Sequence, residues 1–191
     1  MRMSRLFAFL ALFGMSSFAA LAQAEEPPGF ENIDPIAYGD MFIDAVHEHK
    51  AGHLADSFRK FLRLACGGDK TSQEQVGLMY LNGEGVYKNT AMAYLWLKLA
   101  SEYNFGPFRA IVKKIEKVMT PEQAKHFGQL ADELRTEYGL RATNIRCDTT
   151  SSATLSSNIK DTVVCVPERS GSLLRVQRCY ADEAHAGAAA R

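Results

Sequence analysis

The chain has 191 residues, 47% of them hydrophobic, and its 22 lysines and arginines balance its 22 acidic residues. This length suits one domain with a sizeable hydrophobic core. Because neither sign of charge dominates, the composition excludes a strongly basic nucleic-acid-binding protein and gives no indication of a membrane-surface partner.

Residues 1–24 have the pattern of a secretory signal peptide. Arg2 and Arg5 precede an apolar run from Leu6 to Ala22, and Ala22-Gln23-Ala24 forms a small-residue cleavage site. The alternative is a membrane anchor, but the run is short and is interrupted by Gly14, Ser16 and Ser17. We therefore expect cleavage, a linker at 25–33, and a periplasmic or secreted protein without membrane insertion.

Two helices are predicted before residue 67. Asp34 and Pro35 provide an N-cap and a first-turn proline, and Gly52 ends the helix that they begin. A second helix is predicted from Leu54 to Cys66, before a Gly-Gly-Asp step.

The stretch from Val76 to Trp96 predicts two helices joined by a tight turn. The first helix is expected to start near Ser72. Gly83 and Gly85 allow the chain to reverse, because glycine accepts positive φ without a steric penalty. Asn89 is a suitable N-cap for the second helix, whose small and large apolar residues favour close helix packing.

This pattern closely resembles a Sel-one-like repeat, a relative of the tetratricopeptide repeat. The matching positions are Gly77, Tyr80, Gly83, Gly85, Val86, Lys88, Asn89, Ala93, Tyr94, Trp96 and Ala100. The resemblance implies an exported bacterial member of that family, with an all-α fold. It would be a short right-handed α-solenoid of helix-turn-helix repeats with a small disulfide-linked C-terminal extension. FLRLA at Phe61–Ala65 echoes WLKLA at Trp96–Ala100, so a degenerate copy is expected upstream.

The helical pattern continues to residue 139. A helix is predicted from Pro107, and Thr120 to Gln123 forms a capping box with proline at the first helical position. Gly139 is a natural stop for the helix that follows. Residues 34–139 are therefore expected to hold about six helices, of which the last pair caps the array.

The composition changes after Gly139. Residues 140–180 are rich in serine, threonine and valine, and Asp161–Val166 and Leu173–Tyr180 are candidate strands. We expect a small appended segment tied by disulfides, and a disordered tail at 181–191.

The four cysteines predict two disulfides in an oxidising compartment. Three pairings are compatible with the sequence. The resemblance to bacterial repeat proteins favours Cys147–Cys165 and Cys66–Cys179. A zinc site is the alternative, but no CxxC or closely spaced Cys/His pair is present.

Candidate catalytic or metal-binding groups are few. His49 and His53 are four residues apart, as on one face of a helix, but Gly52 interrupts that helix and His47 lies on a different side. Cys66 with His126 as a nucleophile pair is less simple than a disulfide at Cys66. We expect no enzymatic activity, no cofactor and no metal.

The resemblance implies a non-enzymatic adaptor or scaffold that binds a protein or peptide in the cell envelope. Tyr87 and Tyr103, expected in exposed turns, are the candidate partner-binding aromatics. A secreted effector or cell-wall-associated factor that docks another protein is one alternative. A metal-binding or hydrolytic protein that uses the His47/His49/His53 cluster is the other.

Overall fold

The computed structural model describes residues 30–143, 145–150, 162–167 and 174–177, and this part of the chain is mostly helical, as predicted. The helices are α1 (Pro35–Ala51), α2 (Leu54–Cys66), α3 (Lys70–Asn82), α4 (Thr90–Ala100), α5 (Gly106–Glu116), α6 (Pro121–Tyr138) and α7 (Leu140–Thr143). The strands are β1 (Phe30–Ile33), β2 (Ile145–Thr150), β3 (Thr162–Pro167) and β4 (Leu174–Gln177).

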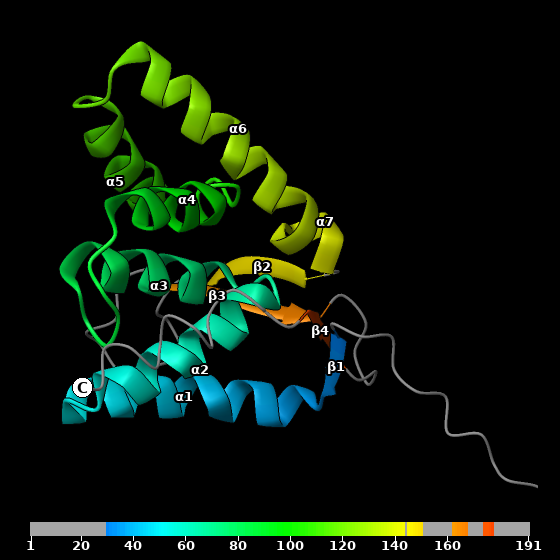
Figure 1. The fold of residues 1–191 in the computed structure, drawn as a ribbon. Coiled ribbons are helices and arrows are strands. Elements are labelled where there is room, and N and C mark those ends of the chain that lie inside the picture. Colours follow the sequence, from blue (N-terminus) through cyan, green and yellow to red (C-terminus); the bar gives the residue numbers. More distant parts are fainter. Residues whose placement is uncertain (1–29, 144, 151–161, 168–173, 178–191) are drawn as a thin grey trace, which may run out of the picture.

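The longer helices are stacked in chain order (Figure 1). Helices α1 and α2 form the bottom of the stack, α3 and α4 lie above them, and α5 and α6 are at the top. Helix α1 packs on α2, α3 packs on α4, and α2 joins these two pairs by packing on α3. Helices α5 and α6 both pack against α4. Each pair of helices therefore covers the pair that precedes it.

The predicted helix starts are confirmed by their capping contacts. Asp34 Oδ1 accepts a hydrogen bond from the Ile36 amide at 2.8 Å, and Asn89 Oδ1 accepts one from Met92 at 3.0 Å. Thr120 and Gln123 exchange both bonds of a capping box. These side chains satisfy amides that the first turn of a helix leaves unpaired. The bounds of α2 are those expected from the sequence.

Two helix ends differ from expectation. Helix α3 begins at Lys70, earlier than Ser72, because the Asp69 carboxylate accepts the Ser72 amide at 2.6 Å and acts as the N-cap. Gly139 follows α6 as predicted, but its φ of −76° is not left-handed. A side chain at Gly139 would overlap the carbonyl of Arg135, so this glycine is needed for close packing.

Large residues of the Val76–Trp96 stretch form part of the core. Trp96 is only 3% exposed, and Tyr80 makes an edge-to-face contact with Phe58 of α2 at a centroid distance of 5.2 Å. Both belong to a cluster built from α1, α2, α3 and α4. The motif aromatics Tyr80 and Trp96 are therefore packing residues and are not available as binding anchors.

Two antiparallel strand pairs, β1–β4 and β2–β3, lie beside the helices. Strand β4 falls in the predicted segment Leu173–Tyr180, and β3 matches the predicted segment Asp161–Val166 to within one residue at each end. Strands β1 and β2 were not predicted. Residues 25–33 were expected to be a linker, yet residues 30–33 form a strand because β4 supplies its hydrogen-bonding partner. The buried side of β2 and β3 packs on α1, α2, α4 and α5 through a shared cluster of Tyr38, Leu64, Ala100, Phe108, Ile145, Cys147, Val163 and Cys165.

The predicted disulfide between Cys147 and Cys165 is present and joins β2 to β3. Cys66 is also disulfide-bonded, while its predicted partner, Cys179, lies outside the described residues. The predicted signal peptide at 1–24 and the predicted tail at 181–191 lie outside them too. Among the helices that the structure describes, none has the length and apolarity to span a bilayer.

Candidate functional site

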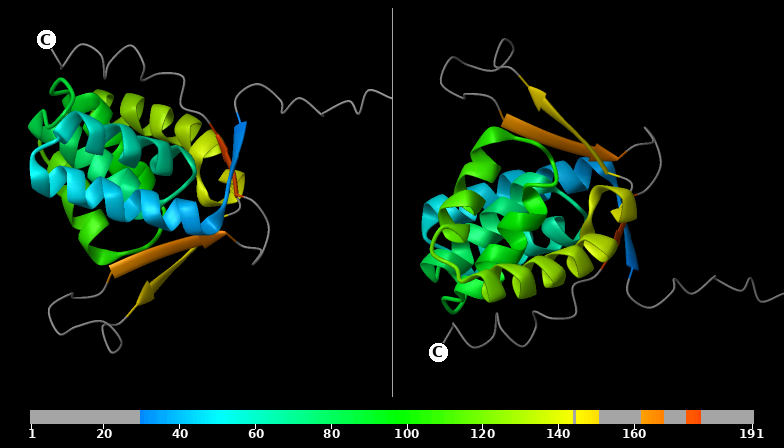
Figure 2. Two further views of the ribbon diagram at one scale, coloured as in Figure 1. Left: turned by 90° about the horizontal axis from the view of Figure 1, so that it is seen from below. Right: turned by 90° about the horizontal axis from the view of Figure 1, so that it is seen from above.

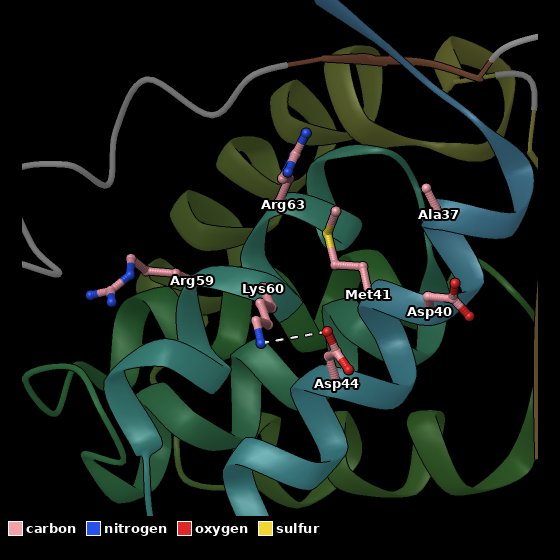
Figure 3. A pocket seen from close by; sticks show the side chains of 7 residues that line it. All are labelled: Ala37, Asp40, Met41, Asp44, Arg59, Lys60 and Arg63. Atoms are coloured by element: carbon pink, nitrogen blue, oxygen red, sulfur yellow. Dashed lines mark ion pairs between the residues drawn. The ribbon is translucent and has the colours of Figure 1, made fainter.

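The best candidate site is a groove between α1 and α2, at the end of the helix stack (Figure 3). Its volume is approximately 460 Å³. The residues that line it are Ala37, Asp40, Met41, Asp44, Arg59, Lys60 and Arg63. It is referred to below as the α1–α2 groove.

The spacing of residues along the two helices gives the groove walls of opposite charge. Asp40 and Asp44 are four residues apart and therefore lie on one side of α1. Arg59 and Arg63 have the same spacing on α2, whose opposite side is buried in the core. The antiparallel packing of α1 and α2 thus sets an acidic wall against a basic wall.

Ion pairs bridge the walls at one end of the groove. Lys60 Nζ lies 3.8 Å from Asp44 Oδ2 (Figure 3). It also lies 3.3 Å from Glu48 Oε1. The hydrogen bond with His53 and, to a smaller extent, the one with Lys60 lower the pKa of Glu48. Asp40, nearer the N-terminus of α1, is exposed and has no ion pair within the described ranges. The charge of Asp44 is thus balanced by Lys60, whereas the carboxylate of Asp40 is left to interact with a bound molecule.

Apolar surface accompanies these charges on α1. Met41 is half-buried inside the groove, where its side chain points toward α2. Ile36 and Ile43, on the same helix, are 74% and 53% exposed. Exposed large aliphatic side chains next to a groove are typical of a surface that contacts another protein.

The three histidines do not converge on one point. His49 Nε2 is 2.9 Å from Glu84 Oε2, and His53 Nδ1 is 2.7 Å from Glu48 Oε2, whereas His47 is exposed. Two of the histidines thus have separate carboxylate partners, Glu84 for His49 and Glu48 for His53. No group of three metal-binding side chains occurs within the part of the chain that the structure describes. The His49–Glu84 pair instead links the end of α1 to the α3–α4 turn.

The two predicted binding tyrosines differ in exposure. Tyr87 is 59% exposed, in the turn before α4. Tyr103 is half-buried and packs against the cluster that holds the Cys147–Cys165 disulfide. Tyr103 therefore lies in a turn, as predicted, but it is half-buried and not exposed. Neither tyrosine lines the α1–α2 groove.

The disulfide at Cys66 removes its thiol, so this residue is not a nucleophile, and its sulfur is fully buried with the core of α2.

A second hollow lies near the C-terminus of α6 and is lined by Glu102, Asp132, Arg135, Thr136, Arg141 and Ala142. Glu102 already accepts bonds from Lys70 and the Leu140 amide, which makes it a structural residue.

Glu74 on α3 is a half-buried carboxyl without a hydrogen bond or ion pair among the described residues. Burial raises its pKa from 4.5 to about 7. Because the folded-state pKa is the higher one, the proton stabilises the fold below pH 4.5, and this contribution is lost as the pH rises through 7.

Replacing Glu74 with glutamine is expected to raise the free energy of unfolding by about 1–2 kcal/mol at pH 8, after allowance for solvent screening, and to change it little near pH 5. Urea unfolding at both pH values measures this difference. Glu133→Gln, at an exposed position of α6, controls for the loss of one negative charge. An equal effect of Glu74→Gln at both pH values would contradict the expectation.

A comparison with protein-family models finds none that matches the sequence, and a comparison with curated proteins also finds no match.

Sequence reasoning missed the residues of the α1–α2 groove. The i, i+4 spacings of Asp40 with Asp44 and of Arg59 with Arg63 could have been recognised as charged faces of two helices. Their placement on facing walls depends on how α1 and α2 pack, which the spacings do not determine.

Proposed function

We propose that the chain is an exported Sel-one-like repeat protein that binds a segment of another protein in the α1–α2 groove. It acts as a non-enzymatic adaptor in the cell envelope. The observation that carries the proposal is the groove with its two oppositely charged walls, its half-buried Met41 and the exposed Ile36 and Ile43 alongside. Charged and apolar side chains arranged in this way favour recognition of another protein.

The repeat assignment is supported by equivalent burial in α2 and α4. Phe61 and Trp96 are 2% and 3% exposed, and Ala65 and Ala100 are both fully buried. These residues occupy corresponding places in FLRLA and WLKLA. In this proposal, α1–α2 and α3–α4 are successive repeats of a right-handed solenoid, and α5 with α6 forms the capping pair.

The position of the groove in such an array explains why it is open. Each helix pair of a solenoid buries one face against the next pair, and the first pair has a face that no earlier repeat covers. The groove also defines what would bind. A suitable segment carries an apolar side chain over Met41 and a basic side chain toward Asp40, whereas Arg59 is already paired with Asp56 of its own helix.

The disulfides support the proposal that the protein is exported from the cytosol. A bond between Cys147 and Cys165, together with the oxidised Cys66, is typical of proteins outside the reducing cytosol. Export to the periplasm or beyond agrees with the signal pattern at the start of the sequence.

Site-specific crosslinking in intact cells tests the proposal. A photoreactive residue at Ala37, which lines the groove, is expected to capture one protein, with the crosslinks confined to one segment of it. The same residue at Val118, which is 84% exposed in the α5–α6 turn, is the matched control. Equal capture from both positions, or none from Ala37, would argue against binding in the groove.

Charge reversal then tests the groove with the purified partner segment. Asp40→Lys is expected to raise the dissociation constant about 10-fold, since it places a positive charge opposite a basic side chain. Glu137→Lys, at an exposed position of α6, makes the same change of charge away from the groove and should leave binding unchanged. Calorimetric titration of both variants measures the difference.

A further inference from the structure

Strand β2 lies on the outside of the β2–β3 pair, and β3 lies between it and the helices (Figure 2). Two contacts hold β3 against the start of α3. The Thr71 hydroxyl donates to the Val163 carbonyl at 2.9 Å, and the Lys70 amide donates to Cys165 Sγ at 3.4 Å. Of the strands that the structure describes, β2 pairs with β3 alone. Within the described residues, its second edge therefore has no partner strand and is available for pairing.

The register shows which main-chain groups lie on that open edge. Cys147 and Cys165 are directly opposite each other, and their Cα atoms are 4.0 Å apart. This short spacing identifies a pair without mutual backbone hydrogen bonds, in which both residues direct their N–H and C=O groups away from each other. With a period of two, Ile145 and Thr149 share this orientation with Cys147. The Val163 carbonyl, opposite Thr149, reaches Thr71 on the far edge of β3 and agrees with this assignment.

The outer face of β2 carries one positive and one negative side chain. Arg146 and Asp148 are 64% and 65% exposed, and Arg146 Nε is 3.2 Å from Asp148 Oδ2. They are placed symmetrically on either side of Cys147. Their neighbours across the pair, Val166 and Val164, are also exposed.

We propose that two copies of this chain associate through β2, which pairs antiparallel with β2 of the second copy about a two-fold axis at Cys147. Ile145 then forms a hydrogen-bonded pair with the partner subunit's Thr149, and Cys147 with the partner subunit's Cys147. Arg146 lies opposite the partner subunit's Asp148, and the two-fold axis repeats this pair. The open edge and its charges are thus self-complementary, as an isologous interface requires.

The charges also select this register over its neighbours. A two-fold axis at Arg146 also pairs the outward main-chain groups, but it sets two arginines directly opposite each other. An axis at Asp148 sets two aspartates opposite each other. Like charges in directly opposed positions destabilise a strand pair, whereas opposite charges stabilise it. Of these three registers, only the one at Cys147 joins unlike charges.

Sedimentation velocity of the purified full chain, with its disulfides intact, tests the proposal. The wild type is expected to dimerise as its concentration rises. Arg146→Asp and Asp148→Arg each place like charges opposite each other and are expected to weaken the dimer at least about 10-fold. An equimolar mixture of the two variants restores unlike pairs and is expected to form a heterodimer of near wild-type affinity.

Thr149→Pro provides a second test, because proline removes an N–H on the open edge and leaves the hydrogen bonds to β3 in place. We expect a folded monomer, with circular dichroism and the Cys147–Cys165 bond unchanged. A wild type that stays monomeric up to about 1 mM would overturn the proposal. So would a dimer insensitive to all three substitutions, or a monomeric chain that accepts an unrelated extended peptide at β2.

Discussion

Replacing Gly85 with alanine is expected to lower the free energy of unfolding by about 3–4 kcal/mol, whereas the same change at Gly83 should cost about 1–2 kcal/mol. Both glycines have left-handed backbone angles, with φ of +68° and +77°. Both substitutions therefore impose the same conformational strain. A Cβ at Gly85 would also overlap the carbonyl of Leu54 and lie 2.7 Å from the Ala55 nitrogen, whereas at Gly83 the nearest atom is 3.4 Å away, on Lys88.

Equilibrium urea unfolding of the two variants and the wild type measures this difference. Because the turn and the start of α2 would both have to shift, Gly85→Ala should also weaken the His49–Glu84 contact, which joins α1 to the same turn. Equal losses for Gly83→Ala and Gly85→Ala would show that backbone strain alone governs the turn and that its contact with α2 contributes nothing.

Gly83 and Gly85 show which features of the turn could be predicted from the sequence and which could not. Its positive φ angles could be predicted from the local pattern, because only glycine accepts them without a penalty. The reason for the second glycine could not, since the atom that excludes a side chain at Gly85 belongs to Leu54, in another helix. Helix ends such as Asp34, Asn89 and Thr120 were predictable for the same local reason.

The strands were predicted less well, because strand formation depends on a partner from elsewhere in the chain. Phe30–Ile33 lacks a clear alternating pattern and is a strand through its pairing with Leu174–Gln177. The pairing of Ile145–Thr150 with Thr162–Pro167 likewise joins segments with an intervening stretch of chain. The α1–α2 groove has the same origin, since its two walls come from different helices. Local chemistry thus predicts element ends, while sites between elements require the packed fold.

Loss of the Glu102 carboxylate is expected to destabilise the fold by about 3–5 kcal/mol, because it leaves the ammonium group of Lys70 buried and uncompensated. The Lys70 side chain is completely buried, and its Nζ donates to Glu102 Oε2 at 2.7 Å, to Gln73 Oε1 at 2.9 Å and to the Leu99 carbonyl at 3.4 Å. Glu102 Oε2 also accepts the Leu140 amide at 3.1 Å. This one pair therefore joins the start of α3, the end of α4 and the start of α7.

Glu102→Gln, Lys70→Met and the double variant form a cycle that isolates the pair. Lys70→Met leaves a carboxylate that is still 19% exposed, so it should cost less than Glu102→Gln. The double variant should be close to the wild type, because an apolar chain replaces the buried charge and no charge is left unpaired. If the two single changes simply add in the double variant, the pair makes no coupled contribution.

The pH dependence of the stability of Glu102→Gln tests independently whether Lys70 is left as an uncompensated buried charge. Burial lowers the pKa of Lys70 from 10.5, and Glu102 opposes that shift. A lysine whose folded-state pKa is depressed binds its proton less tightly in the folded state, so stability rises with pH between the folded-state and unfolded-state pKa values. Without Glu102 the depression is greater and this window is wider. The variant is therefore expected to recover part of its lost stability as the pH rises toward 10.5, the ordinary pKa of lysine. A loss that stays constant over this rise would show that Lys70 remains charged and is solvated by other groups.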